Sequence, residues 1–94
     1  MEWRLFANLA EAAGSKHVEV DVTAGESLGD AFERLLDAHP DLEPLVLDSD
    51  GELEGHIHLL YNGEDPFVAA DGFDTVLEAD DELALFPPVS GGSS

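Results

Sequence analysis

The side-chain pattern in this sequence that most resembles a chemical site is a pair of histidines. His56 and His58 stand two residues apart, so in a strand both side chains point to one face, where they could hold one side of a metal ion. A zinc site needs further ligands, and the chain has no cysteine and no third ligand in register. We therefore interpret the pair as surface histidines and expect no metal site. The lack of cysteine also excludes disulfides, iron–sulfur clusters and a catalytic thiol.

The C-terminal segment is the second candidate, because it contains no charged side chain. From Pro87 it reads Pro-Pro-Val-Ser-Gly-Gly-Ser-Ser, with the paired glycines at Gly91 and Gly92. Taken alone, Gly-Gly-Ser-Ser is also typical of a flexible linker or of residues added by an expression vector. We expect a domain over residues 1–88 and a flexible tail over residues 89–94 that carries the two glycines.

Several segments alternate apolar and polar residues with the period of two that is typical of strands. In the first of them, Trp3 and Leu5 would face the core. Arg4 and Phe6 would lie on the opposite face. A brief helical turn over residues 8–13, ending at Gly14, would return the chain to pair the first two strands antiparallel. The predicted strands are residues 2–7, 17–22, 56–61 and 82–86.

One main helix is predicted between the second and third strands. Ser27 is a good N-cap with Asp30 as its capping-box partner, and Pro40 ends the helix after about Ala38. One apolar stripe along this helix must pack on a sheet. It consists of Leu28, Ala31, Phe32, Leu35 and Leu36.

The connections carry turn signals, and the elements together give a fold class. Asn62-Gly63 follows the third strand and is a strong hairpin signal. Within residues 65–79, Phe67-Val68 and Val76-Leu77 are expected to anchor the chain to the core. The sequence predicts an α+β fold with one main helix packed across a mixed sheet of four to five strands.

An apolar set occupies strand positions that should face solvent. Phe6, Leu60 and Phe86 all fall on the outer face of the predicted sheet, with Ala84 beside them. In so acidic a protein we expect polar residues there, so the set indicates a surface that docks a partner. The alternative is that loop residues cover these side chains.

The charge balance limits the partners. The chain has 22 Asp plus Glu against 3 Lys plus Arg, a net charge of −19, so we expect neither nucleic acid nor a membrane as partner. Without a long apolar run or a signal sequence, a cytoplasmic location is expected. A nucleic-acid mimic would concentrate its carboxylates in rows, whereas these are spread along the chain. An even acidic coat favours adaptation to high salt, where the Debye length falls to about 3 Å at 1 M.

Three segments carry a resemblance that covers nearly the whole chain: Leu-Phe-Ala-Asn-Leu-Ala-Glu-Ala-Ala-Gly at 5–14, Ile-His-Leu-Leu-Tyr-Asn-Gly at 57–63 and Glu-Leu-Ala-Leu-Phe-Pro-Pro-Val-Ser-Gly-Gly at 82–92. The chain resembles the molybdopterin synthase small subunit and the small archaeal ubiquitin-like modifier proteins, and with its acidity a haloarchaeal member. The resemblance implies a β-grasp (ubiquitin-like) fold. Asp80-Asp81 departs from the family's common Gly-Asp turn. The partner-binding residues it implies are Phe6, Leu60, Phe86, Pro87, Pro88 and Val89.

The resemblance also implies a carrier protein and not an enzyme. An E1-like enzyme would use ATP to adenylate the carboxylate of Gly92, and the chain itself would bind no cofactor. Sulfur transfer would then give a thiocarboxylate for the molybdopterin synthase large subunit, whereas attack by a target lysine would give an isopeptide bond. Both outcomes need the same tail and the same docking surface. Gly91 and Gly92 suit a narrow active site because they have no Cβ.

Two further points bear on this interpretation. Ser93 and Ser94 make Gly92 an internal amide, so either a processing protease removes them or they are an addition that blocks activation. Lys16 is the only lysine and is therefore the candidate acceptor, beside the α-amine, if the protein forms isopeptide-linked chains; otherwise it is an ordinary solvated side chain. A deconjugating protease would be a further partner. The alternative from another class is a non-covalent β-grasp adaptor whose tail is never activated.

Overall fold

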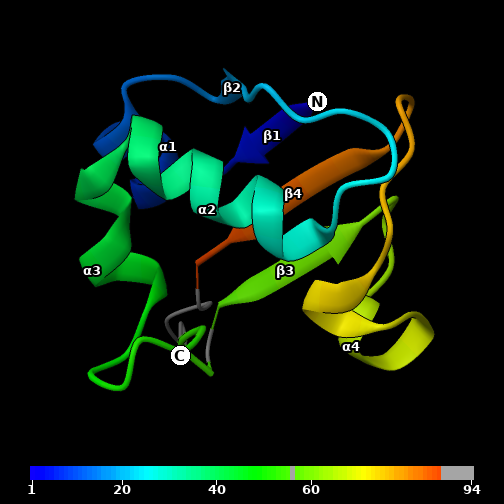
Figure 1. The fold of residues 1–94 in the computed structure, drawn as a ribbon. Coiled ribbons are helices and arrows are strands. Elements are labelled where there is room, and N and C mark those ends of the chain that lie inside the picture. The colour runs from blue at the N-terminus through cyan, green and yellow to red at the C-terminus, as the bar shows by residue number, and fades with distance from the viewer. Residues whose placement is uncertain (56, 88–94) are drawn as a thin grey trace.

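A four-stranded mixed sheet forms one layer of the molecule, and a single long helix lies across it (Figure 1). The structure is a computed structural model that describes residues 1–55 and 57–87. The strands are β1 (Glu2–Leu5), β2 (His17–Glu19), β3 (His58–Tyr61) and β4 (Glu82–Phe86). The helices are α1 (Asn8–Ala13), α2 (Leu28–Ala38), α3 (Glu43–Val46) and α4 (Pro66–Ala69), with single 3-10 turns η1 (Pro40–Leu42) and η2 (Gly72–Asp74).

The strand order is β2-β1-β4-β3, which places β4 in the interior of the sheet. β1 and β4 run parallel, and the two outer pairs are antiparallel. The predicted α+β class with a mixed sheet of four strands is therefore confirmed.

The long helix α2 forms where the local signals place it. The Ser27 hydroxyl accepts a hydrogen bond from the Asp30 amide at 3.2 Å, and the Asp30 carboxylate accepts one from the Ser27 amide at 3.1 Å. This capping box satisfies two backbone donors at the helix start. The helix ends at Ala38 before Pro40, and each residue of its predicted apolar stripe is buried.

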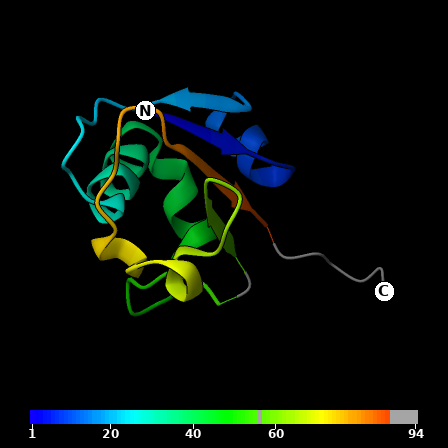
Figure 2. The same ribbon diagram turned by 90° about the vertical axis from the view of Figure 1, so that its right-hand side faces the viewer.

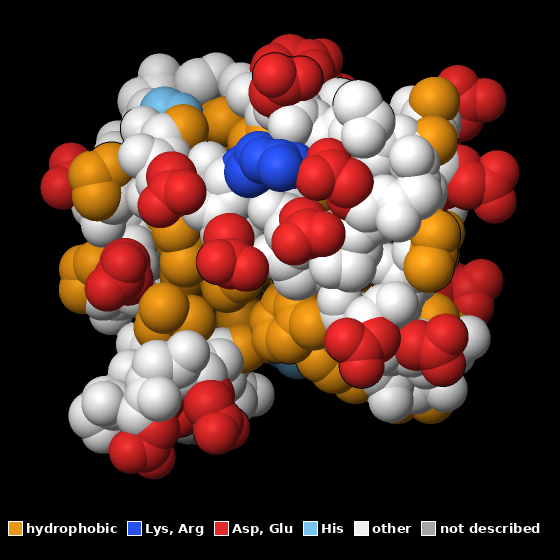
Figure 3. All heavy atoms as spheres, viewed as in Figure 1, with side chains coloured by type: hydrophobic (Ala, Val, Ile, Leu, Met, Phe, Trp, Pro, Cys, Tyr) orange, Lys and Arg blue, Asp and Glu red, His pale blue; other side chains and the backbone are white. Residues whose placement is uncertain are grey.

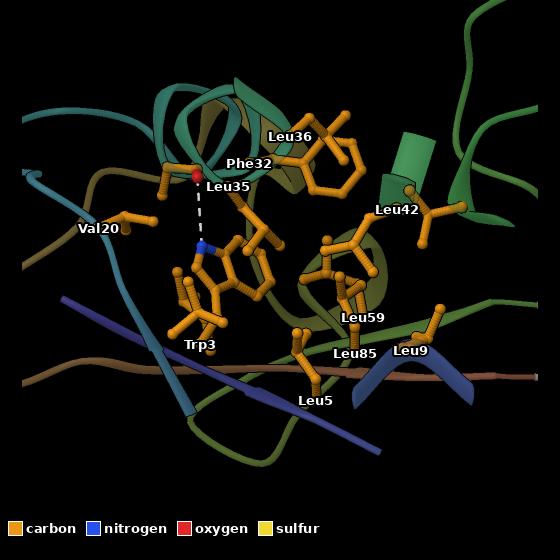
Figure 4. Packing of buried hydrophobic residues seen from close by; sticks show 14 of the residues in the cluster. Trp3, Leu5, Leu9, Val20, Phe32, Leu35, Leu36, Leu42, Leu59 and Leu85 are labelled. Carbon is orange, nitrogen blue, oxygen red and sulfur yellow. Dashed lines mark hydrogen bonds between the residues drawn. The ribbon is translucent and has the colours of Figure 1, made fainter. Parts of the chain in front are cut away.

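Trp3 joins the sheet to this helix at the centre of the core. Its side chain is fully buried, and its indole N–H donates to the Ala31 carbonyl at 3.1 Å (Figure 4). Leu5 lies beside it on β1, and Leu83 and Leu85 extend the same buried face onto β4. The predicted alternation of buried and outward residues on β1 and β4 is confirmed.

The second strand is shorter than predicted. α1 and its left-handed cap at Gly14 match the expectation, and β2 pairs antiparallel with β1. The pairing stops at Glu19 because β1 has no further residues: the Val20 amide already donates to the Met1 carbonyl at 2.9 Å. Val20 stays buried, but Val22 is only half-buried.

The third strand also differs from expectation. Asn62-Gly63 does form a tight turn, with φ of 52° and 83° and hydrogen bonds in both directions between Tyr61 and Glu64. The chain then enters α4 and no second strand follows, because Asp65 caps that helix and Pro66 occupies its first turn. The antiparallel partner of β3 is β4 instead. Alternation along this strand predicts that Ile57, Leu59 and Tyr61 face inward; Ile57 and Leu59 are buried, but Tyr61 is only half-buried.

The apolar anchors predicted for the connection are wrong in part. Leu77 is fully buried, but Val68 and Val76 are 83% and 61% exposed. Val76 makes an isolated antiparallel bridge with Ser27, which turns its side chain away from the core that Leu77 enters.

Asp81 joins the turn after β3 to the start of β4. Its carboxylate accepts hydrogen bonds from the Tyr61 hydroxyl, the Asn62 side-chain amide and the Glu78 amide, at 2.7–2.9 Å. Burial acts to raise the pKa of Asp81, but these hydrogen bonds outweigh it and the pKa is lowered. The hydrogen bond between the Tyr61 hydroxyl and the Asp81 carboxylate also raises the pKa of Tyr61. Asp81, which matches the Asp of the Gly-Asp turn, thus holds the turn after β3 against the start of β4, while the departure from that turn is Asp80. No helix in the described residues is long and apolar enough to cross a bilayer.

Candidate functional site

The outer face of the sheet carries a pair of stacked phenylalanines. Arg4 lies beside Ala84 and Leu5 beside Leu85 in the parallel register of β1 and β4, so Phe6 follows next to Phe86. The two rings stack with their centroids 4.2 Å apart and an interplanar angle of 8°. Phe6 remains 38% exposed. The alternative that loops cover this face is therefore wrong for Phe6.

The neighbouring strand extends this apolar surface. Leu60 on β3 lies directly opposite Ala84, and both are half-buried. Phe6, Leu60, Ala84 and Phe86 are called the apolar patch below. Pro87 follows the patch and is half-buried. The sequence thus placed these residues on one face correctly, and the structure brings the two rings into contact.

The rest of the outer face of the sheet carries charged and polar residues. Glu2 and Glu82 are neighbours at the other end of the parallel pair. Between them and the patch lie Arg4, at 3.9 Å from the Glu82 carboxylate, and His17, whose Nδ1 is 2.9 Å from the Glu2 carboxylate. Arg4 and His17 are cross-strand partners that the sequence gave no reason to pair, since only the register brings them together.

The backbone next to the patch is in an unusual conformation. Ala7 precedes α1 with φ 53° and ψ −130°, a combination that Cβ disfavours in every residue except glycine. Strain of this kind costs about 1–3 kcal/mol and is often found at functional positions. Here it lets the chain turn sharply after Phe6, which keeps that ring on the outer face.

The segment expected to carry the chemistry begins at this end of the sheet. β4 is an interior strand, and its last residue, Phe86, belongs to the apolar patch. Figure 2 shows β4 running to this edge of the molecule. Pro88, Val89, Gly91 and Gly92 lie outside the described residues, as does the predicted flexible tail.

The other candidate positions are Lys16 and the two histidines. Lys16 is exposed just before β2, and its carbonyl accepts a hydrogen bond from the Leu5 amide at 2.8 Å. His58 is exposed on β3 opposite Phe86, while its predicted companion His56 lies outside the described residues. Residues 1–55 and 57–87 hold no group of three or more possible metal ligands.

Comparison with known proteins decides the family. The ThiS family model matches residues 3–92, which is nearly the whole chain. The chain belongs to the ThiS family. Its ThiS-family sheet and helix are those of the ubiquitin-like β-grasp fold, as the sequence resemblance implied.

Within the ThiS family the similar proteins are archaeal modifiers. The chain is 58% identical to small archaeal modifier protein 1 of Haloferax volcanii over 92 residues, covering 98% of this chain and 100% of that protein. The crystal structure of that protein superposes with a TM-score of 0.85 at 54% identity, covering 98% of each chain. The solution structure of small archaeal modifier protein 1 from Methanosarcina acetivorans gives a TM-score of 0.80 at 35% identity, covering 97% of this chain and 94% of that one.

These findings confirm the resemblance to small archaeal ubiquitin-like modifiers. They support a role as a ubiquitin-like carrier or modifier, since the relatives are small archaeal modifier proteins.

Proposed function

We propose that this chain is a covalent carrier whose Gly92 carboxylate is activated by an E1-like enzyme that docks on the apolar patch. The observation that carries the proposal is the ThiS-family match, which extends to residue 92 and leaves Ser93 and Ser94 outside it. The patch supports it, because an exposed Phe6 ring stacks on a half-buried Phe86 ring on an otherwise acidic chain, at the strand end nearest the tail. The Arg4 guanidinium beside the patch would suit an acidic side chain on the partner.

The proposed chemistry begins with a poor electrophile. The Gly92 carboxylate attacks the α-phosphorus of ATP, pyrophosphate leaves, and the acyl adenylate now has a good leaving group. A persulfide on a partner then attacks the acyl carbon and displaces AMP to give an acyl disulfide. A thiol cleaves its S–S bond, forming a new disulfide and releasing the thiocarboxylate that the molybdopterin synthase large subunit would use. From Phe86 to Gly92 an extended chain reaches about 20 Å, enough to cross an active-site channel while the patch stays docked. Such ATP-dependent activation would take place in the cytoplasm.

Protein tagging is the second candidate, favoured by the archaeal modifier relatives. In this route a lysine amine of a target protein displaces AMP from the same acyl adenylate and forms an isopeptide bond. A protease that removes Ser93 and Ser94 would be needed for either route, since Gly92 otherwise has no free carboxylate. A deconjugating protease would reverse the tagging route.

The proposal is tested by measuring ATP–pyrophosphate exchange with the E1-like enzyme of the same organism. A chain truncated after Gly92 should support exchange, and the chain ending at Ser94 should not, because only the first has the reactive carboxylate. Truncation after Gly91 is the matched control and should fail. If the chain ending at Gly92 gives no more exchange than the control, it is not a carrier, and the non-covalent adaptor becomes the better account.

A further inference from the structure

A second surface lies at the β3 edge of the sheet, on the helix side; of the apolar patch, Leu60 also lines it. An open groove of about 920 Å³ runs between α2, residues 47–55, β3 and α4. Figure 3 shows hydrophobic side chains in this hollow below α2, with acidic side chains around it. The carrier chemistry proposed above does not use this groove.

One side of the groove is the free edge of β3. The Asn62 amide donates to the Glu82 carbonyl at 2.9 Å, so the even-numbered residues of β3 direct their backbone groups to β4. Leu59 therefore directs its N–H and C=O away from β4, into the groove that it lines. The flanking odd residues are occupied within the chain, because the Tyr61 amide donates to Glu64 and the Ile57 amide donates to Glu54. Leu59 thus offers one donor and one acceptor at the centre of the edge.

The side of the groove opposite β3 is formed by aromatic rings that pack against one another. Phe67 is 48% exposed, and its ring packs edge-on against Phe73 with centroids 5.1 Å apart. Phe73 in turn packs against Phe32 on α2, with the ring centroids 5.4 Å apart. A Cβ at Gly72 would lie 3.0 Å from the Phe67 ring, so glycine allows this close approach. The exposed ring is therefore preorganised, which lowers the entropic cost of binding.

The rim of the groove is acidic. Glu33, Glu52, Glu54 and Asp65 line it, and among its lining residues there is no lysine or arginine. A second copy of this chain, with its net charge of −19, would bring further negative charge to this rim. The rim therefore favours a basic partner.

We propose that this groove binds an extended peptide segment of a partner protein, with alternating apolar residues and flanking lysine or arginine, which adds to β3 as a further strand. The Leu59 N–H and C=O would pair with the peptide backbone, and the apolar side chains would pack between Phe67 and the face of α2. The acidic rim would pair with the basic flanks. The groove and the apolar patch meet at Leu60, but the stacked rings of Phe6 and Phe86 do not line the groove, so a partner could be held here while the tail is engaged elsewhere.

The test uses the full chain, labelled with ¹⁵N, and a capped seven-residue peptide of alternating valine and lysine as the probe. Titration should shift the amide resonances of Leu59, Phe67 and Phe73 saturably and slow hydrogen exchange at the Leu59 amide. Two matched probes should not bind: one with glutamate in place of lysine, and one with its central backbone nitrogen methylated. Rising salt should weaken binding.

Variants assign the binding to the groove. Phe67→Ala should weaken the probe about tenfold or more, as loss of an aromatic anchor does. If that variant fails to fold, Glu33→Gln combined with Glu52→Gln removes rim charge and should also weaken binding. The matched pair Glu11→Gln and Asp37→Asn, which lie outside the groove, should leave it unchanged.

Three results would overturn the proposal. These are a lack of saturable shifts with the lysine probe, equal binding of the methylated probe, or shifts centred on Phe6 and Phe86. Because no activating enzyme or free C-terminus is involved, a negative result here leaves the proposed carrier function standing.

Discussion

Replacing Phe86 by alanine separates docking from folding. The ring is half-buried and stacks on Phe6 at 4.2 Å, a contact that contributes about 0.5–1.5 kcal/mol beyond buried area. Because the ring is not fully buried, we expect a stability loss of about 1–2 kcal/mol, below the 3–5 kcal/mol typical of core phenylalanines. If the ring is an anchor for the activating enzyme, its loss costs about 2 kcal/mol of binding, or roughly 30-fold in kcat/KM.

The neighbouring residue provides the control for that experiment. Leu85 lies on the opposite face of the same strand and is fully buried, so Leu85→Ala should cost about 2–5 kcal/mol of stability. At temperatures where both variants remain folded, Leu85→Ala should keep near-normal kcat/KM in ATP–pyrophosphate exchange with chains ending at Gly92. The reasoning is refuted if Phe86→Ala loses stability as Leu85→Ala does while its activation stays normal.

Further predictions concern charge, strain and the lysine. The urea midpoint should rise from low salt to multimolar KCl, because screening relieves the repulsion of 19 net negative charges; equal midpoints would exclude the high-salt interpretation. The Glu26 pKa is lowered to about 2, first by the hydrogen bond from Arg34 and next by that from the Thr23 amide. The pKa of Glu26 in the folded state lies below its usual 4.5. The stability that the Glu26 carboxylate contributes is therefore present above pH 4.5 and is lost as the pH falls toward 2. Arg34→Met should reduce this loss, which thermal midpoints across that pH range would measure. Ala7→Gly should raise stability by about 1 kcal/mol in urea unfolding, by relieving the positive φ; a lower midpoint would show that Ala7 is unstrained. Lys16→Arg should abolish any lysine-linked polymer of this chain on denaturing gels, and its persistence would contradict the assignment.

The elements that the sequence predicted well are those with local causes. The capping residue Ser27, the apolar stripe that follows it and Pro40 define α2 within one stretch of chain. Alternation likewise fixed which residues of β1 and β4 face the core. The length of β2 depends on where its partner β1 begins. The hairpin that Asn62-Gly63 indicates is limited to its turn, because Pro66 and the Asp65 cap start a helix there.

In the candidate site, too, features with local causes could be predicted, and features that depend on strand register could not. Periodicity placed Phe6 and Phe86 on one face, but their stacking depends on the parallel register, which a single sequence does not reveal. The pairing of Arg4 with His17 has the same origin. Phe67 was expected in the core and instead stands at the groove, because Phe73 lies between it and α2.

The most direct test of the carrier function is mass spectrometry of the endogenous protein and its conjugates. Because Arg34 is the last basic residue, trypsin would leave residues 35–92 on a target, whereas cleavage after Glu82 leaves a compact remnant, residues 83–92. The account predicts a C-terminus at Gly92, with one oxygen replaced by sulfur, or this remnant on lysines of other proteins. An endogenous chain that keeps Ser93 and Ser94, with no remnant on any lysine, would contradict it.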